Sequence, residues 1–178
     1  MSYQIALSEL HSKIGTETHV GEWLTIDQAR INAFADATLD NQWIHVDPER
    51  ASRESPFGGP VAHGYLTLSL LPYLMGRVNA EKPSYPGIKL SVNYGLNRVR
   101  FPHPVVAGSR VRARTELVSV EEVGGDGLQL VSKVTIEIDG ATKPACVAET
   151  VSRMYFRVAS GELRLPWHDA PVRPVSAG

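Results

Sequence analysis

Apolar and polar side chains alternate through much of the second half of the chain. Four stretches show this alternation: residues 88–94, 111–117, 128–138 and about 144–156. A period of two is typical of half-buried strands, because successive side chains point to opposite faces of a sheet. Gly124-Gly125-Asp126-Gly127 predicts the turn between the second and third strands, and Asp139-Gly140 is a two-residue hairpin signal before the fourth. The pattern therefore predicts a mostly antiparallel sheet.

The first half of the chain favours helices. From Val61 to about Val78 nearly every side of the segment is apolar, which is typical of a helix surrounded by protein, and Pro72 predicts a kink. Thr25-Ile26-Asp27-Gln28 has the pattern of a capping box and predicts a short helix over roughly 26–36. Residues 37–60 have few periodic apolar positions and predict a long loop. Because such a loop is uncommon in a compact domain unless it is functional, it indicates a site.

One buried helix followed by long strands predicts an α+β fold, in which a curved antiparallel sheet wraps around the helix. The chain has 178 residues, which suits a single domain. We expect its core to span about residues 20–156, followed by a polar, proline-containing tail over 157–178. Because the edges of such a sheet are commonly covered by a second copy, we expect a homodimer.

Composition and charge narrow the classes of function. Hydrophobic residues make up 43% of the chain and charged residues 21%, as in globular proteins. The 18 basic side chains nearly balance the 19 acidic ones, so we expect neither nucleic acid nor a membrane surface as a partner. Cys146 is the only cysteine, which excludes an internal disulfide and favours the reducing cytoplasm. The sequence shows neither a signal-peptide pattern nor an apolar run of membrane-spanning length.

Asp40 and His45 are the candidate catalytic residues. General acid–base chemistry needs two groups that exchange protons near neutral pH, and an aspartate beside a histidine supplies them. Both residues fall in the long predicted loop, and Trp43 and Ile44 between them offer apolar walls that would desolvate the pair. The plainer alternative is that Asp40 turns the loop and His45 is an ordinary half-buried histidine.

Gly64 is the candidate for stabilising negative charge. It falls in the first turn of the predicted buried helix, where backbone N–H groups have no intrahelical acceptor. An N–H group there can hold a developing oxyanion. Close packing of the helix is an equally good reason for a glycine at this position.

Two other groups of polar residues have weaker claims. His45, Asp47 and His63 have ligand types that suit a metal, but their spacing matches no usual metal signature, so we expect no metal. Five arginines lie on the predicted strands and their connection: Arg98, Arg100, Arg110, Arg112 and Arg114. They suit an anionic ligand by type, but charged outer faces of strands are the plainer interpretation for most of them.

One block of the chain resembles a known enzyme motif. It reads FADATLDNQWIHVDPERA and then FGGPVAHGYLTLSLL, and it is similar to the hydratase motif of the MaoC-like dehydratases, the hotdog-fold (R)-specific enoyl-CoA hydratases. The stretch NYGLNRVRFPHPV is similar to the NodN-like branch of that family. The resemblance covers about residues 20–156. It implies a single hotdog domain, a homodimer, and reversible addition of water to trans-2-enoyl thioesters without a metal or organic cofactor.

The resemblance also implies roles for individual residues. Asp40 and His45 match the pair that holds the water, and Gly64 matches the helix-start amide that polarises the thioester carbonyl. His45 would take a proton from the water, and Asp40 would deliver the proton to the α-carbon. Arg98 or Arg100 would face the CoA phosphates.

The chain departs from the family pattern D-x-N-P-x-H at two positions. Gln42 stands in place of the asparagine and Trp43 in place of the proline. Gln42 still donates and accepts hydrogen bonds, but with a longer reach, and we expect it to contact the substrate. Trp43 is bulky enough to remodel the acyl pocket.

Two other functions fit the same residues. A hotdog thioesterase would direct water to the thioester carbonyl instead of the β-carbon, and it would release free CoA. A noncatalytic subunit would bind the acyl thioester as the partner of an active chain. The joint presence of Asp40, His45 and Gly64 argues against the noncatalytic subunit.

Overall fold

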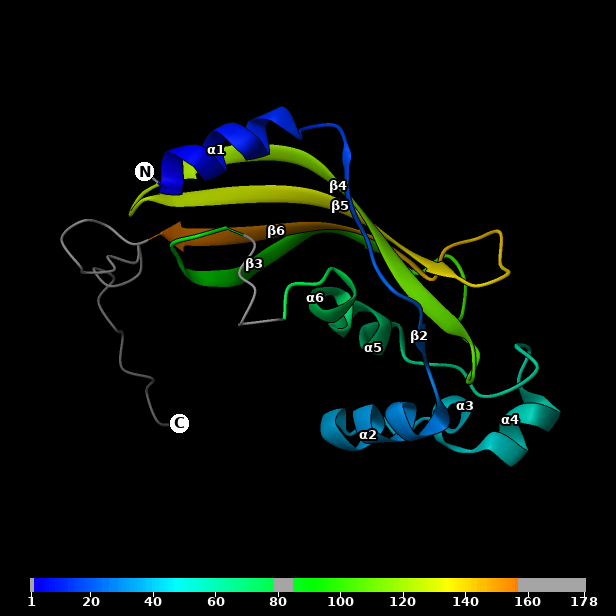
Figure 1. Ribbon diagram of the computed structural model, residues 1–178. Helices are drawn as coiled ribbons and strands as arrows, with labels where there is room; N and C mark the ends of the chain where they lie inside the picture. Colours follow the sequence, from blue (N-terminus) through cyan, green and yellow to red (C-terminus); the bar gives the residue numbers. More distant parts are fainter. Residues whose placement is uncertain (1, 79–84, 157–178) are drawn as a thin grey trace, which may run out of the picture.

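An antiparallel sheet forms the frame of the protein (Figure 1). The computed structural model describes residues 2–78 and 85–156; the predicted tail over 157–178 lies outside them. The strands run in the order β1-β4-β5-β6-β3, and β2 also pairs with β4. Their bounds are β1 Glu17–Val20, β2 Leu24–Thr25, β3 Ile88–Arg100, β4 Arg110–Val123, β5 Gly127–Ile138 and β6 Cys146–Phe156. The four predicted strands are confirmed, and the curved sheet does not close into a barrel.

Six helices accompany the sheet in the described part of the chain. They are α1 Ser2–Ser12, α2 Gln28–Thr38, α3 Trp43–Val46, α4 Pro48–Glu54, α5 Gly64–Ser69 and α6 Leu71–Leu74. Figure 1 shows α1 along one half of the sheet and α5 and α6 beside the other half. None of the helices in this part is long and apolar enough to cross a membrane.

The predicted helix over 61–78 exists in a shorter and broken form. α5 begins only at Gly64, and Leu70 separates α5 from α6. The break precedes Pro72, because a proline ring would clash with the carbonyl group four residues earlier in a continuous helix. Tyr65 and Tyr73 are 71% and 55% exposed, so the prediction of a helix covered on every side was wrong for the single chain.

One face of the sheet packs against the helices through two apolar clusters. The cluster beside α5 and α6 includes Val111 and Ala113 of β4 and Val134 and Ile136 of β5. The cluster beneath α1 includes Ala6, Leu10, Leu117, Leu128 and Leu130. Buried hydroxyl side chains lie between the clusters, on the same face of the strands: Thr115, Ser132, Thr150 and Ser152. We call these four residues the polar seam.

The arginines of β4 lie among acidic side chains. Arg112 pairs with Glu137 at 2.8 Å, Arg114 pairs with Glu17 at 2.7 Å, and Arg110 pairs with Asp139. Such surface pairs contribute about 1 kcal/mol or less each. For these three arginines the interpretation as charged strand faces is therefore confirmed.

The predicted capping box was wrong. Thr25 belongs to β2 and pairs with Arg110, and the Ile26 N–H donates to the Ser109 carbonyl at 2.9 Å, so strand pairing continues to this point. The helix begins two residues later than predicted. Its N-cap is Asp27, whose carboxylate accepts from the Arg30 N–H at 2.8 Å.

Two predicted connections also differ from the structure. The segment 37–60 is not a structureless loop, because α3 and α4 lie within it. Asp47 caps α4 and Pro48 occupies its first turn, which are the local signals that favour a helix start. The Asp139-Gly140 turn forms, with the Ala141 N–H donating to the Ile138 carbonyl at 3.1 Å. However, β6 starts only at Cys146, so the connection is longer than a two-residue hairpin.

Candidate active site

His45 is held in the site by both its backbone and its ring. It lies in α3 and is only 7% exposed. The ring Nδ1 lies 2.6 Å from the Val61 carbonyl oxygen. Because that oxygen can only accept, Nδ1 carries the proton in the neutral ring and Nε2 keeps its lone pair. Gln28 Nε2 donates to the His45 carbonyl at 2.7 Å, which anchors the backbone of α3.

Asp40 follows a left-handed turn at the end of α2. Leu39, the C-cap residue, has φ 62° and ψ 18°. This conformation costs a non-glycine residue about 1–2 kcal/mol. The turn directs Asp40 toward the start of α5, where its carbonyl oxygen lies 2.9 Å and its carboxylate Oδ2 4.0 Å from His63 Nε2. The carboxylate itself remains 54% exposed, so substrate and water have access to it.

His63 connects Asp40 to His45. It is 2% exposed and forms the N-cap of α5. Its Nε2–H donates to the Asp40 carbonyl, and its ring stacks on His45 with centroids 3.7 Å apart and planes inclined by 27°. The buried Nδ1 of His63 has no hydrogen-bond partner among the described residues. One carboxylate oxygen and one nitrogen from each ring all lie within 4.8 Å of one another.

The structure therefore brings Asp40 and His45 together, as their spacing in the sequence suggested, and adds His63. In the sequence, His63 was a candidate only as a metal ligand, together with His45 and Asp47. Asp47 instead caps α4 through the Arg50 N–H at 2.9 Å. A signal for His63 was available in the sequence: it directly precedes Gly64, which places it at the N-terminus of the predicted helix.

Burial sets the protonation of His45. Desolvation is the largest cause that lowers the pKa of His45 below its ordinary value, and the neighbouring His63 lowers it further. The hydrogen bond to Val61 and the Asp40 carboxylate oppose this shift. The net lowering keeps the ring neutral near pH 7, so its Nε2 is available to accept a proton.

The geometry of the two rings suits proton exchange better than metal binding. Metal ligands direct their lone pairs at one centre, about 2.0–2.1 Å from each histidine nitrogen for zinc. Here the two rings are stacked, so their lone pairs lie in nearly parallel planes. One nitrogen of each ring is already bonded to a backbone carbonyl.

Gly64 begins α5, as the predicted first-turn position requires. A Cβ at this position would lie 3.1–3.2 Å from atoms of the Phe101 ring. The alternative of close packing is therefore supported by the structure. Because the Gly64 N–H is in the first turn, its availability to a substrate carbonyl follows from helix geometry.

Gln42 and Trp43 lie at the start of α3. Gln42 is the N-cap residue and is exposed, but its side chain makes no capping bond. The guanidinium of Arg50 lies over the Trp43 ring, with its central carbon Cζ 4.3 Å from the ring centroid. Trp43 thus contacts α4 on one side of the site.

Comparison with known proteins decides the family. The family described as "MaoC like domain" matches residues 9–138, well over half of the chain. The chain belongs to this family. The 3-hydroxyacyl-thioester dehydratase Z of Mycobacterium tuberculosis is 49% identical to it over 148 residues, which cover 83% of this chain and 95% of that protein.

Two further relatives agree with the MaoC-like assignment. Nodulation protein N of Rhizobium leguminosarum bv. viciae is 44% identical over 154 residues, covering 86% of this chain and 94% of that protein. The solved structure of the (R)-hydratase from A. caviae involved in PHA biosynthesis superposes with a TM-score of 0.58 at 26% identity. The superposition covers 76% of this chain and 96% of the (R)-hydratase chain. The hotdog fold is confirmed, and this MaoC-like chain is a hydro-lyase with a dehydratase or hydratase function.

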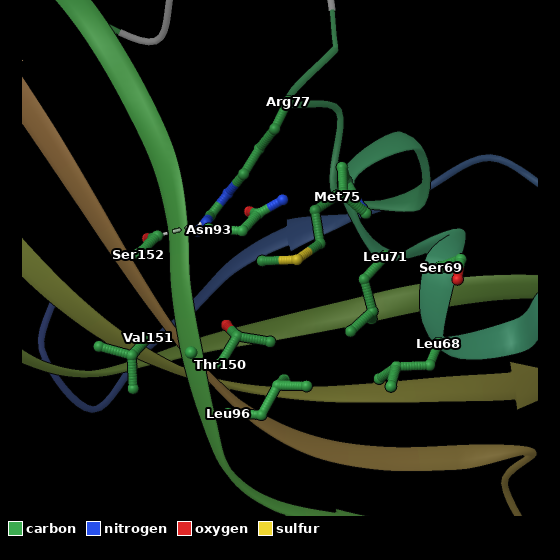
Figure 2. A pocket seen from close by; sticks show the side chains of 12 residues that line it. Leu68, Ser69, Leu71, Met75, Arg77, Asn93, Leu96, Thr150, Val151 and Ser152 are labelled. Atoms are coloured by element: carbon green, nitrogen blue, oxygen red, sulfur yellow. Dashed lines mark hydrogen bonds between the residues drawn. The ribbon is translucent and has the colours of Figure 1, made fainter. Parts of the chain in front are cut away.

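A cavity of about 460 Å³ lies along α5 and α6 (Figure 2). Its walls come from these helices and from β3 and β6. Leu68 lines it and lies four residues after Gly64, about 6 Å further along the helix axis. Trp43, which was expected to remodel the acyl pocket, is not among the residues that line this cavity.

Proposed function

We propose that this MaoC-like protein adds water reversibly to the double bond of trans-2-enoyl thioesters and forms (3R)-3-hydroxyacyl thioesters. The observation that carries the proposal is the convergence of Asp40 with a buried His45 whose Nδ1–H is tied to the Val61 carbonyl. The relatives named as a dehydratase and an (R)-hydratase support it.

In the proposed reaction, His45 Nε2 accepts a proton from water as the water oxygen bonds to the β-carbon. Asp40 orients the water through its carboxylate. The proton that His45 takes from the water passes to this carboxylate, which gives it to the α-carbon, so both groups return to their starting states. One carboxylate oxygen of Asp40 and one ring nitrogen of His45 lie within 4.8 Å of each other, a distance that one bridging water spans.

The thioester carbonyl would accept a hydrogen bond from the Gly64 N–H. Charge develops on this oxygen when water adds to the β-carbon, and a fixed N–H donor stabilises it more in the transition state than in the substrate. Gln42, exposed at the start of α3, would contact the substrate beside Asp40. The acyl chain would follow α5 into the cavity that Leu68 and Leu71 line.

The proposed active unit is a homodimer that pairs through β3. This strand is one edge of the sheet: β6 pairs with one side of it, and no strand in the described part of the chain pairs with its other side. Tyr94 and Leu96 of β3 are 55% and 46% exposed. A free, partly apolar edge of this length favours pairing with a second copy. Arg98 and Arg100 on the same strand are the proposed partners of the CoA phosphates.

The experiment that tests the function uses crotonyl-CoA with a thiol reagent present. Loss of the enoyl absorbance without release of free thiol supports hydration. Release of thiol would replace the proposal with a thioesterase, because only attack at the carbonyl frees CoA. If binding is measurable by calorimetry while neither signal changes with acyl chains of any length, the noncatalytic subunit becomes the better account.

A further inference from the structure

Arg77 is a cation without an acidic partner among the described residues. It follows α6 and lines the cavity beside α5 and α6. Its Nη1 donates to Ser152 Oγ at 3.0 Å, which uses one of its five N–H groups. The three arginines of β4, by contrast, each pair with a carboxylate. Although Arg77 is exposed in the single chain, the surrounding protein lowers the pKa of Arg77 by desolvation.

The cavity has two chemically different ends. Figure 2 shows Arg77 reaching toward Ser152 and Asn93 at one end, and Leu68 and Leu96 at the other. Asn93 and Ser152 are neighbours across β3 and β6, so the polar end is built from paired strands. The apolar end is the one closer to the catalytic groups along α5. A ligand that enters from Gly64 therefore meets apolar walls first and the guanidinium last.

The polar end continues beyond Arg77. A second cavity of about 370 Å³ shares Met75 and Arg77 with the first. It is also lined by Thr115 and Ser132 of the polar seam. Thr115 is 3% exposed, and its Oγ1 has no hydrogen-bond partner among the described residues. A buried hydroxyl without a partner costs about 1–3 kcal/mol, which a polar ligand or ordered water recovers.

We propose that the substrates include trans-2-enoyl thioesters with a carboxylate at the far end of the acyl chain, and that Arg77 binds this carboxylate. The inference rests on the proposed hydration at Asp40 and His45. Arg77 holds four N–H donors that Ser152 does not use, and a planar guanidinium binds a carboxylate in a bidentate manner. Asn93 lines the first cavity and Thr115 the second, and Arg77 lines both, so each cavity offers the anion a neutral hydrogen-bond donor besides the guanidinium.

The length of the helices sets the length of chain that fits. A continuous helix from Gly64 to Leu74 would rise about 15 Å at 1.5 Å per residue, and the break at Leu70 makes this an upper limit. An extended chain advances about 1.25 Å per bond, as judged from the 3.8 Å that three backbone bonds span. An acyl chain of at most about twelve bonds therefore runs from the carbonyl site to the end of α6, which Arg77 follows.

The test compares three acyl-CoA substrates of equal chain length, in a series of about 8 to 14 carbons. One ends in a carboxylate, one in its methyl ester and one in a methyl group. Wild type is expected to prefer the carboxylate by about 10-fold to 100-fold in kcat/KM, the range of one charge-assisted interaction. Arg77→Gln should lose this preference without losing hydration of the methyl-terminated chain, and Arg77→Lys should keep part of it.

Matched controls separate the possible results. Arg53→Gln, an exposed arginine on α4, should leave the preference unchanged. Equal hydration of all three substrates by wild type would overturn the inference and leave the proposed function intact, whereas hydration of none would overturn the proposed function. If Arg77→Gln weakens every CoA thioester equally but no N-acetylcysteamine thioester, Arg77 binds CoA phosphate and the inference is also overturned.

Discussion

Two amide substitutions at His45 test two roles of the ring independently: its hydrogen bond to Val61 and its action as a base. The amide nitrogen of asparagine occupies the place of Nδ1, and that of glutamine occupies the place of Nε2. His45→Asn can therefore still donate to the Val61 carbonyl, which lies 2.6 Å from Nδ1, whereas His45→Gln cannot. Neither amide is a base, so both variants lose the proposed proton acceptor.

The stability difference between these variants follows from the burial of Val61. This residue is 4% exposed, so its carbonyl has little access to water when the donor is lost. An unsatisfied buried acceptor costs about 1–3 kcal/mol, and we expect His45→Gln to be less stable than His45→Asn by about 1–2 kcal/mol. Urea unfolding measures the difference, with the slope m expected to be unchanged.

Activity should respond differently from stability. Loss of a positioned general base lowers kcat by about 100-fold to 10,000-fold, so both variants should be nearly inactive with crotonyl-CoA. If His45→Asn kept a tenth of wild-type kcat, His45 would not be the base. If the two variants were equally stable, the bond to Val61 would not be what holds the ring.

Three further predictions concern the neighbours and the pH dependence of His45. Leu39→Asn should raise the free energy of unfolding by about 1 kcal/mol, because asparagine tolerates the left-handed conformation, while Leu39→Ala should give no such gain in urea unfolding. His63→Gln keeps a donor at the Nε2 position for the Asp40 carbonyl, so it should retain about 10-fold more kcat than His63→Asn at similar KM. The lowered pKa of His45 predicts that kcat/KM stays flat down to about pH 6.5 and falls only at lower pH. Below about pH 6.5 the free energy of unfolding should also decrease as pH falls, because His45 binds a proton more readily in the unfolded chain than in the folded one.

The strands were predictable because their signal is local. In β5, and in β4 as far as Leu117, every second side chain is buried, so the period of two reports directly on the sheet. The α1 helix gave no comparable signal. Its buried residues Ala6 and Leu10 are one helical turn apart, but Ile5 lies off this face and is 59% exposed, which weakens the pattern.

The site was predictable in composition but not in its connections. The order of Asp40, His45 and Gly64 along the chain was enough to select them. The bond from His63 to the Asp40 carbonyl depends on Leu39 adopting a left-handed conformation, which leucine disfavours. No local pattern predicts such a turn. Likewise, the polar seam and Arg77 come together only after three strands and a helix are assembled.

The direct test is the hydration rate of Asp40→Asn with crotonyl-CoA. Asp36→Asn, at an exposed position of α2, serves as the control. Asparagine preserves the backbone carbonyl that His63 binds but has no proton to deliver to the α-carbon. The account predicts a loss of kcat of at least about 100-fold for Asp40→Asn and unchanged activity for Asp36→Asn. Wild-type activity in Asp40→Asn would contradict the proposed pair.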